Sequence, residues 1–447
     1  MFNRKQLWAL LIPLIFEEVL TSLLGTVDTM MVSSISSAIS AVSLVDSLNV
    51  LMIQLFSAMA TGGAIICSQY IGRGDKHEAA ATGQQLLASI TLIAAAIGVF
   101  CAVFRTPLLS LIFGQVEADV MRDSRIYLFV TALSFPFLAL YSAGAAVYRA
   151  HGNSRLPMVI SVISNVFNII GNAVLIYGLH MGVLGVAIPT LLARMFTAVA
   201  MLACIRRKGG RVHVDSLLHW RPDLSRIGHI LRIGIPTGIE NSMFQFGKLV
   251  IQSTISTMGT AAIAANAMAA QLENFVSHAP IAMGLGMMTV VGQCIGAGRQ
   301  DEAIRYTKKL TWYSWGFLLI GNAWMAASVR WITQISGMEQ QAADIAVYMT
   351  LWIAFYKSLP WTWAFLPAHG MRAAGDVRYS MIVSTISMWV CRVAVVLFLA
   401  KTHPGIGPIA MWIGMFTDWT VRAICFYIRF RSGAWLKHQV LKEQNPA

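Results

Sequence analysis

Long apolar runs follow one another along the whole chain, and short polar segments separate them. Each run is about as long as the 20 residues that a helix needs to cross the hydrocarbon core of a bilayer. The runs occupy residues 7–32, 47–70, 83–104, 126–147, 156–177, 182–205, 233–258, 270–294, 310–329, 343–366, 379–400 and 406–428. This pattern predicts an all-α polytopic membrane protein with twelve transmembrane helices and no further domain.

The composition agrees with a membrane protein and excludes several other classes. Charged residues make up 12% of the chain, whereas about a quarter of a soluble domain is charged. The net charge of +13 does not indicate a nucleic acid partner, because the Lys and Arg residues lie in short loops rather than on one polar face. The six cysteines lie in or beside apolar runs without metal-ligand spacing, so we interpret them as buried free thiols.

The positions of Lys and Arg predict the orientation in the membrane, since cytoplasmic loops carry the excess of basic residues. With a cytoplasmic N-terminus, 23 of the 33 basic residues fall on the cytoplasmic side, five outside and five within spans. We therefore expect both termini in the cytoplasm. The N-terminal run has the basic start of a signal peptide but no small-residue cleavage site, so we interpret it as the first span.

Three segments of the first half recur in the second half, in the same order and at nearly the same spacing. The pairs are LIPLIFEE (11–18) and GIPTGIEN (234–241), SQYIGRGDKHEA (68–79) and GQCIGAGRQDEA (292–303), and YRAHGNSR (148–155) and MRAAGDVR (371–378). Each copy holds six predicted helices, an even number, so both copies enter the membrane in the same direction. We expect an N-terminal lobe at 1–205, a cytoplasmic linker at 206–231, a C-terminal lobe at 232–431 and a cytoplasmic tail at 432–447.

With these repeats the chain resembles the multidrug and toxic compound extrusion (MATE) family over nearly its whole length. The resemblance is carried by VDTMMVSSIS (27–36), by the paired Q-x-I-G-x-G-x-x-x-E-A and R-x-x-G-x-x-R loops, and by the NxxxN pattern of Asn168 and Asn172. It implies two parallel six-helix repeats that form a V-shaped central cavity. It also implies export of small organic, often cationic, compounds in exchange for H+ or Na+. We further expect a monomer in the plasma (inner) membrane without a cofactor.

Asp28 is the leading functional candidate, because an acid inside a spanning helix is costly unless it faces protein or water. It lies near the outer end of its helix, at a height similar to those of Asn172 and Thr190. Asn168 and Asn172 share one helix face. The carboxylate, two amide oxygens and the Thr190 hydroxyl make an all-oxygen site for Na+, or Asp28 alone carries a proton. The alternative is that Asp28 only braces its helix through a hydrogen bond.

The resemblance matches these four residues to the coupling-ion cluster of the N-terminal lobe. Many relatives have Asp where this chain has Asn172, so the choice between H+ and Na+ stays open. The corresponding residues of the second copy are Gln252, Cys391, Val395 and Ile413. Some relatives have acids where this chain has Phe244 and Trp361. We therefore expect one ion site, in the N-terminal lobe alone.

Glu17 and Glu240 occupy corresponding positions in the two copies, each four residues after a proline. Two interpretations stay open for them. They either line the cavity and attract cationic substrates or relay protons, or they hydrogen-bond between helices in a proline-kinked region. We assign three more residues to the same substrate cavity, Phe244, Gln245 and Trp361. The aromatic faces of Phe244 and Trp361 suit flat hydrophobic cations. The remaining charges within spans, among them Lys248, Lys357, Arg392 and Asp418, are interpreted as internal pairs or as side chains that reach the interface.

The sequence therefore predicts a cation-coupled antiporter that exports amphipathic, often cationic, organic compounds by alternating access. The alternative is a flippase or exporter of a lipid-linked or peptide product, which would need basic cavity residues where this chain shows acids and aromatics. The major facilitator type does not fit, since the loop after the second span lacks its basic signature. An enzyme is not expected, because the chain has no HExxH, G-x-S-x-G or Walker-type motif.

Overall fold

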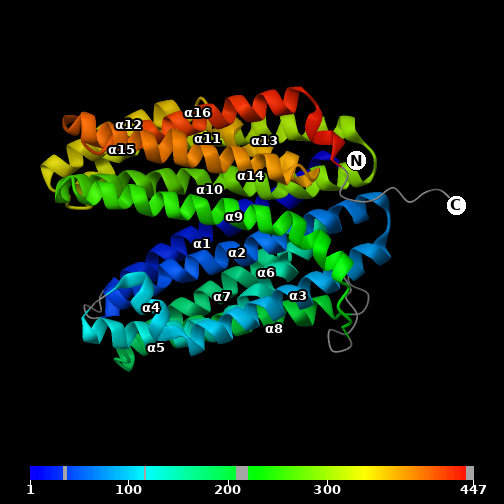
Figure 1. The fold of residues 1–447 in the computed structure, drawn as a ribbon, viewed down its shortest axis with the longest axis horizontal. Coiled ribbons are helices and arrows are strands. Elements are labelled where there is room, and N and C mark those ends of the chain that lie inside the picture. Colours follow the sequence, from blue (N-terminus) through cyan, green and yellow to red (C-terminus); the bar gives the residue numbers. More distant parts are fainter. Residues whose placement is uncertain (34–37, 115–116, 208–219, 439–447) are drawn as a thin grey trace. The chain divides into compact units, whose positions relative to one another are not determined.

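The computed structural model describes residues 1–33, 38–114, 117–207 and 220–438, and these residues form helices without any strand (Figure 1). The first half contains α1 (Arg4–Ser33), α2 (Ala38–Arg73), α3 (Lys76–Val103), α4 (Arg105–Phe113), α5 (Ala118–Leu133), α6 (Phe135–Ala150), α7 (Arg155–Ala173), the π-helix η1 (Val174–Gly178) and α8 (Leu184–Ile205). The second half contains α9 (Leu224–Ser256), α10 (Thr260–Gly296), α11 (Gln300–Ile335), α12 (Gln340–Lys357), α13 (Trp361–Ala373), α14 (Val377–Ile386), the π-helix η3 (Ser387–Val393), α15 (Ala394–Thr402), the short η4 (Pro404–Ile406), α16 (Ile409–Arg431) and the short η5 (Ala434–Lys437).

The described helices follow one another as twelve rods, in agreement with the predicted number of spans. Most rods are single helices. Two of them contain a π-helical segment, in α7–η1 and α14–η3–α15, and two are broken, in α5–α6 and α12–α13. The nine-residue α4 lies after α3 and is too short to cross a bilayer.

Most of these rods are apolar enough to cross a membrane. Eight helical segments of the described chain meet that condition, and α5 with α6, bent by 42°, makes a ninth when the two are taken as one broken span. The rods α9, α11 and α12–α13 do not meet it. Two of these rods bury a charged side chain, Glu240 in α9 and Lys357 in α12.

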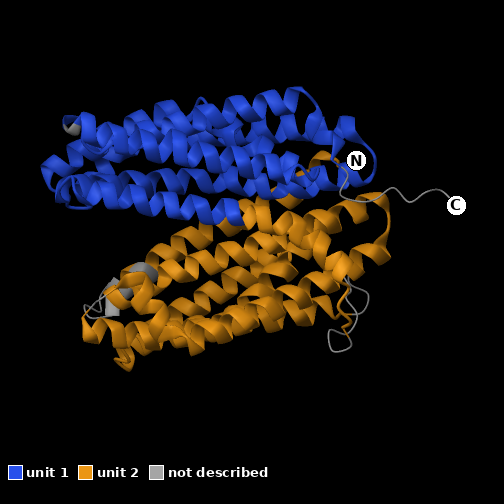
Figure 2. Ribbon diagram, in the orientation of Figure 1, with its two compact units in different colours: residues 1, 239–447 blue, residues 2–238 orange. Residues whose placement is uncertain are grey.

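The chain divides into two compact units, one formed by residues 2–238 and the other by residue 1 with 239–447 (Figure 2). We call them the N-terminal unit and the C-terminal unit. The division lies within α9, because the first half of that helix packs closely on α2. A Cβ atom at Gly62 would lie 2.8 Å from the backbone nitrogen of Gly234. The lobe, linker and tail boundaries expected from the sequence stay predictions, and residues 208–219 and 439–447 lie outside the described residues.

The repeated loops have the same backbone conformation in both units. Gly74 and Gly298, which correspond across the repeat, have φ values of 89° and 71°. Gly152 and Gly375 correspond in the same way, with φ values of 79° and 101°. Only glycine adopts such angles without strain. The glycine of each motif therefore ends one helix and redirects the chain into the next.

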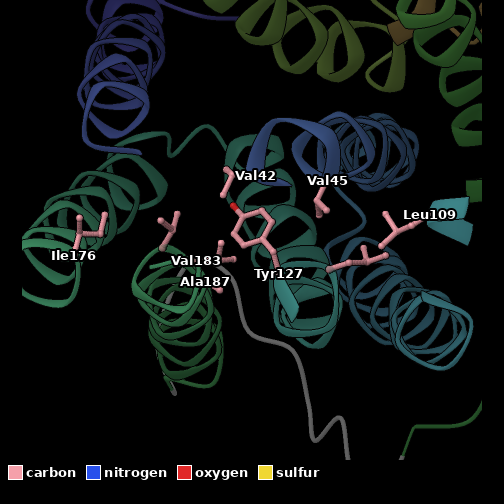
Figure 3. Close-up of a cluster of buried hydrophobic side chains, with 9 residues drawn as sticks. Val42, Val45, Leu109, Tyr127, Ile176, Val183 and Ala187 are labelled. Atoms are coloured by element: carbon pink, nitrogen blue, oxygen red, sulfur yellow. The ribbon is translucent and has the colours of Figure 1, made fainter. Parts of the chain in front are cut away.

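One end of the N-terminal unit is closed by a cluster of buried apolar side chains. Tyr127 of α5 lies beside Val42 and Val45 of α2, with Val183 and Ala187 at the start of α8 on its other side (Figure 3). Ile176 of η1 and Val186 of α8 belong to the same cluster. The cluster fixes α7–η1 and α8 within about one turn of the predicted ion site, which these two helices carry.

Candidate functional site

Three of the four residues predicted to bind the coupling ion form a chain of hydrogen bonds in the N-terminal unit. The amide nitrogen of Asn172 donates to Asn168 Oδ1 at 3.5 Å, and the amide nitrogen of Asn168 donates to Thr190 Oγ1 at 3.3 Å. The Thr190 hydroxyl donates to the Val186 carbonyl at 2.9 Å. Asn172 is fully buried. The structure thus brings these side chains of α7 and α8 together.

The backbone explains why α7 and α8 come so close at this site. A Cβ atom at Gly171 would lie 2.8 Å from Cβ of Pro189, so only a glycine fits between the helices. Asn172 and Thr190 are the next residues on each helix. One turn away on either side, the Ser164 hydroxyl donates to the Ala193 carbonyl at 3.1 Å, and the apolar cluster of Figure 3 begins.

The fourth predicted residue, Asp28, lies on the helical backbone of α1, but its side chain is outside the described residues. α1 packs against α7, the helix that carries both asparagines. The backbone therefore places Asp28 on a neighbour of the hydrogen-bonded chain. Its role as an ion ligand stays a prediction.

Glu17 and Glu240, which correspond across the repeat, form the same ion pair in both units. Arg149 donates to the two carboxylate oxygens of Glu17 at 2.8 and 2.9 Å, and Arg372 donates to Glu240 at 2.5 Å. The two arginines also correspond across the repeat, since each is the first residue of its R-x-x-G-x-x-R loop. The pairs join α1 to α6 and α9 to α13. This geometry favours the interpretation of Glu17 and Glu240 as hydrogen-bonding groups between helices.

In the C-terminal unit, charged groups are buried beside the position that corresponds to the ion site. Cys391, the counterpart of Asn168, lies in η3 next to Arg392. Arg392 and Arg422 both bind the carboxylate of Asp418, the latter at 2.6 Å. The Ser387 hydroxyl donates to the same carboxylate at 2.5 Å. Of the two interpretations given for Arg392 and Asp418, the structure favours internal pairing over side chains that reach the interface.

A cavity of about 210 Å³ lies within the C-terminal unit, between α9, α10, α13, η3 and α16. Phe244 and Trp361, two of the predicted cavity residues, line it together with Lys248, Glu273 and Arg392. Gln245 and Glu240 are not among the described residues that line it. Aromatic side chains line this cavity, and its charged lining is more basic than acidic.

Each half of the chain by itself matches a known family. The MatE family profile matches residues 13–174 and again residues 236–398. The chain belongs to the MatE family. The two matches begin at Pro13 and Pro236, which correspond across the repeat, so the profile recognises the same duplication as the repeated segments. As a MatE protein it is an integral membrane protein of a transporter family.

Several MatE relatives resemble the chain over nearly its full length. The uncharacterized transporter YisQ of Bacillus subtilis is 28% identical and covers 96% of this chain, with 95% of its own length aligned. The probable multidrug resistance protein NorM of Thermotoga maritima is 25% identical over 99% of this chain and 95% of its own. The crystal structure of the Vibrio cholerae MATE transporter VcmN superposes with a TM-score of 0.89 at 17% identity, covering 98% of both chains. That likeness confirms the all-helical MatE fold.

Two acids of this MatE protein, the half-buried Asp46 and the buried Glu273, were not among the predicted site residues. Asp46 of α2 accepts hydrogen bonds from Tyr127 at 3.1 Å and from Asn49 at 3.0 Å. Glu273 of α10 accepts one from Lys357 at 2.7 Å. Asp46 lies one residue outside a predicted apolar run, and Glu273 lies inside one. The rule that an acid within a span is a candidate, applied to every helix, would have found Glu273. Among the described residues no group of three His, Cys, Asp or Glu side chains is arranged to hold a metal, and all six cysteines are free.

Proposed function

We propose that this protein is a cation-coupled antiporter that exports amphipathic, often cationic, organic compounds by alternating access. Coupling would occur at Asp28, Asn168, Asn172 and Thr190. The hydrogen-bonded chain from Asn172 through Asn168 to Thr190 is the observation that carries the proposal. The relatives named as multidrug resistance proteins in Thermotoga maritima and Acinetobacter baylyi support the substrate class.

The chemistry of these groups fits an exchange of one small cation. Amide and hydroxyl oxygens are hard donors that Na+ accepts, and rotation of each amide turns an oxygen instead of a nitrogen toward the site. Asp28 is the titratable member of the set, so it supplies the charge that either ion neutralises. Binding of H+ or Na+ by one carboxylate changes the net charge of the lobe, and this difference is what can bias an alternating-access equilibrium.

The proposal is tested in proteoliposomes that contain the full chain and a single imposed gradient of either pH or Na+. We expect ethidium to move against one of these gradients with the wild-type protein. Asp28→Asn should reduce this movement to the level of empty vesicles while its melting profile in detergent stays normal. Asp344→Asn is the matched control, since Asp344 is exposed on α12. Normal driven transport by Asp28→Asn would contradict the proposal, and movement driven by neither gradient would contradict antiport.

The second candidate is a flippase for a lipid-linked or peptide product. Its support is the lining of the C-terminal cavity by Lys248 and Arg392, because an anionic head group needs basic residues. The volume of about 210 Å³ is small for such a product. Protection of a labelled head group in reconstituted vesicles distinguishes the candidates. Head-group movement that depends on the protein, without ethidium transport, would favour the flippase.

A further inference from the structure

The cavity of the C-terminal unit is surrounded by more positive than negative charge. We call the charged residues in and around it the basic cluster: Lys248, Lys357, Arg392, Arg422, Glu273 and Asp418. Lys357 pairs with Glu273, while Arg392 and Arg422 share Asp418. Four cations and two carboxylates leave an excess of positive charge. Such an excess inside a membrane protein is costly unless an anion or water compensates it.

The aromatic rings of the cavity already face cations that belong to the protein. Lys248 lies 4.8 Å and Arg392 5.0 Å from the centre of the Phe244 ring. Lys357 lies 5.1 Å from the centre of the Trp361 ring. These ring faces are therefore occupied as cation-π partners, and an organic cation would be repelled from the cavity by the same side chains.

Hydrogen-bonding capacity at the cavity wall is left over for a ligand. Arg392 is 1% exposed, and its Nε has no hydrogen-bond partner among the described residues. Nδ1 of His369, another lining residue, also has no hydrogen-bond partner among the described residues. Lys248 lines the cavity and is also exposed. A buried, unsatisfied guanidinium nitrogen costs free energy that a bound acceptor would recover.

We propose that this cavity binds the carboxylate of a small aromatic acid. The carboxylate would lie between Lys248 and Arg392, because hydrogen bonds from Lys or Arg to a carboxylate are charge-assisted and stronger than neutral ones. The ring would pack against Phe365 and Trp419, which line the same cavity. The volume of about 210 Å³ is below the range of about 300 to 1,000 Å³ typical of drug-sized ligands, so an acid of one or two rings fits best. The proposal goes beyond cation-coupled export and does not depend on Asp28.

Equilibrium binding of radiolabelled benzoate and 1-naphthoate to the purified full chain in nanodiscs tests the proposal. We expect saturable binding of at least one acid, displaced by the unlabelled acid. Tenfold higher benzamide, which matches benzoate in shape without its charge, or benzylamine, which carries the opposite charge, should not displace it. Lys248→Gln should weaken binding about tenfold, since a charge-assisted hydrogen bond is lost. Lys248→Arg should keep the affinity within about threefold, because it keeps the charge.

Two further variants separate this proposal from the others. Lys401→Gln removes an exposed charge at the end of α15 and should leave binding unchanged. Asp28→Asn should also leave acid binding unchanged. A failure of the coupling proposal is therefore distinguishable from a failure of the acid-binding proposal. No saturable binding of either acid, equal displacement by benzamide, or wild-type affinity in Lys248→Gln would each overturn the proposal. Normal elution of Lys248→Gln from a sizing column shows that lost binding is not lost folding.

Discussion

The two units share their framework and differ in what they bury at corresponding positions. Both contain the Glu–Arg pair between helices and the loop glycines with positive φ. At the predicted ion site, however, the N-terminal unit holds one buried amide, one half-buried amide and a half-buried hydroxyl, whereas the C-terminal unit buries Arg392, Asp418 and Arg422 nearby. The features that the two units share hold helices in place. Different binding chemistry is therefore expected at the positions where the buried residues differ.

The largest expected effect comes from the acid that holds the basic cluster together. Asp418→Asn would leave Arg392 and Arg422 without their carboxylate, and removal of one partner of a buried ion pair costs about 3 to 5 kcal/mol. We expect a strongly lowered melting temperature of the detergent-solubilised protein or loss of the folded protein from the membrane. Asp344→Asn serves as the control. Unchanged stability in Asp418→Asn would show that the cluster does not stabilise the C-terminal unit.

The feature common to both units predicts a symmetric result. Glu17→Gln and Glu240→Gln should each lower stability by about 1.5 to 3 kcal/mol, the contribution of a hydrogen bond to a charged group, because each breaks its bond to an arginine. Melting curves and the KM for ethidium are measured together. If the two ion pairs only hold helices together, the two variants should show equal melting shifts and an unchanged KM for ethidium. A raised KM with normal melting in either variant would instead support a substrate-binding role.

The difference at the ion site predicts a gain of function in one unit. Asn172→Asp adds a second carboxylate to the hydrogen-bonded chain, and more anionic ligands strengthen cation binding. We expect the Na+ concentration that protects the protein from thermal unfolding to fall about tenfold. Val395→Asp, at the corresponding position of the C-terminal unit, should give no Na+ protection. Equal protection by both variants would remove the distinction between the units.

The smallest effect is expected at the repeated loops. Gly74→Ala and Gly298→Ala should each destabilise by about 1 to 2 kcal/mol, because alanine is strained at positive φ. Neither glycine has an atom within 4 Å of a built Cβ, so the cost would be purely one of backbone conformation. Gly405→Ala, equally uncrowded and without positive φ, is the control. A melting shift confined to one of the two loops would show that the units tolerate strain differently.

Much of the fold could be predicted from the apolar runs and the repeats. The twelve rods coincide with the twelve apolar runs. Each run is a local property of the sequence, so its position and length could be predicted. Depth along the helices predicted a similar height for Asn172 and Thr190, and in the structure a chain of hydrogen bonds through Asn168 joins the two. The partner of Glu17, in contrast, is Arg149, 132 residues further along the chain, and no local pattern indicates it.

The cavity shows the same limit in part. Phe244 and Trp361 were assigned to a surface for organic cations because of their residue type, and the structure places Lys248, Arg392 and Lys357 on their rings. These cations come from three different elements, α9, η3 and α12. Lys248 and Lys357 each lie four residues from the ring that they face, a spacing that the sequence shows, whereas Arg392 reaches the Phe244 ring only because the helices pack together.

The sequence by itself determined the membrane class, the number of helices, the duplication and the spacing of the asparagines, because each follows from residues close together in the chain or from a regular repeat. Only the tertiary structure decided which buried charges neutralise one another and which remain in excess. The free energy of a buried charge depends on every group within a few ångströms, and those groups come from distant parts of the chain.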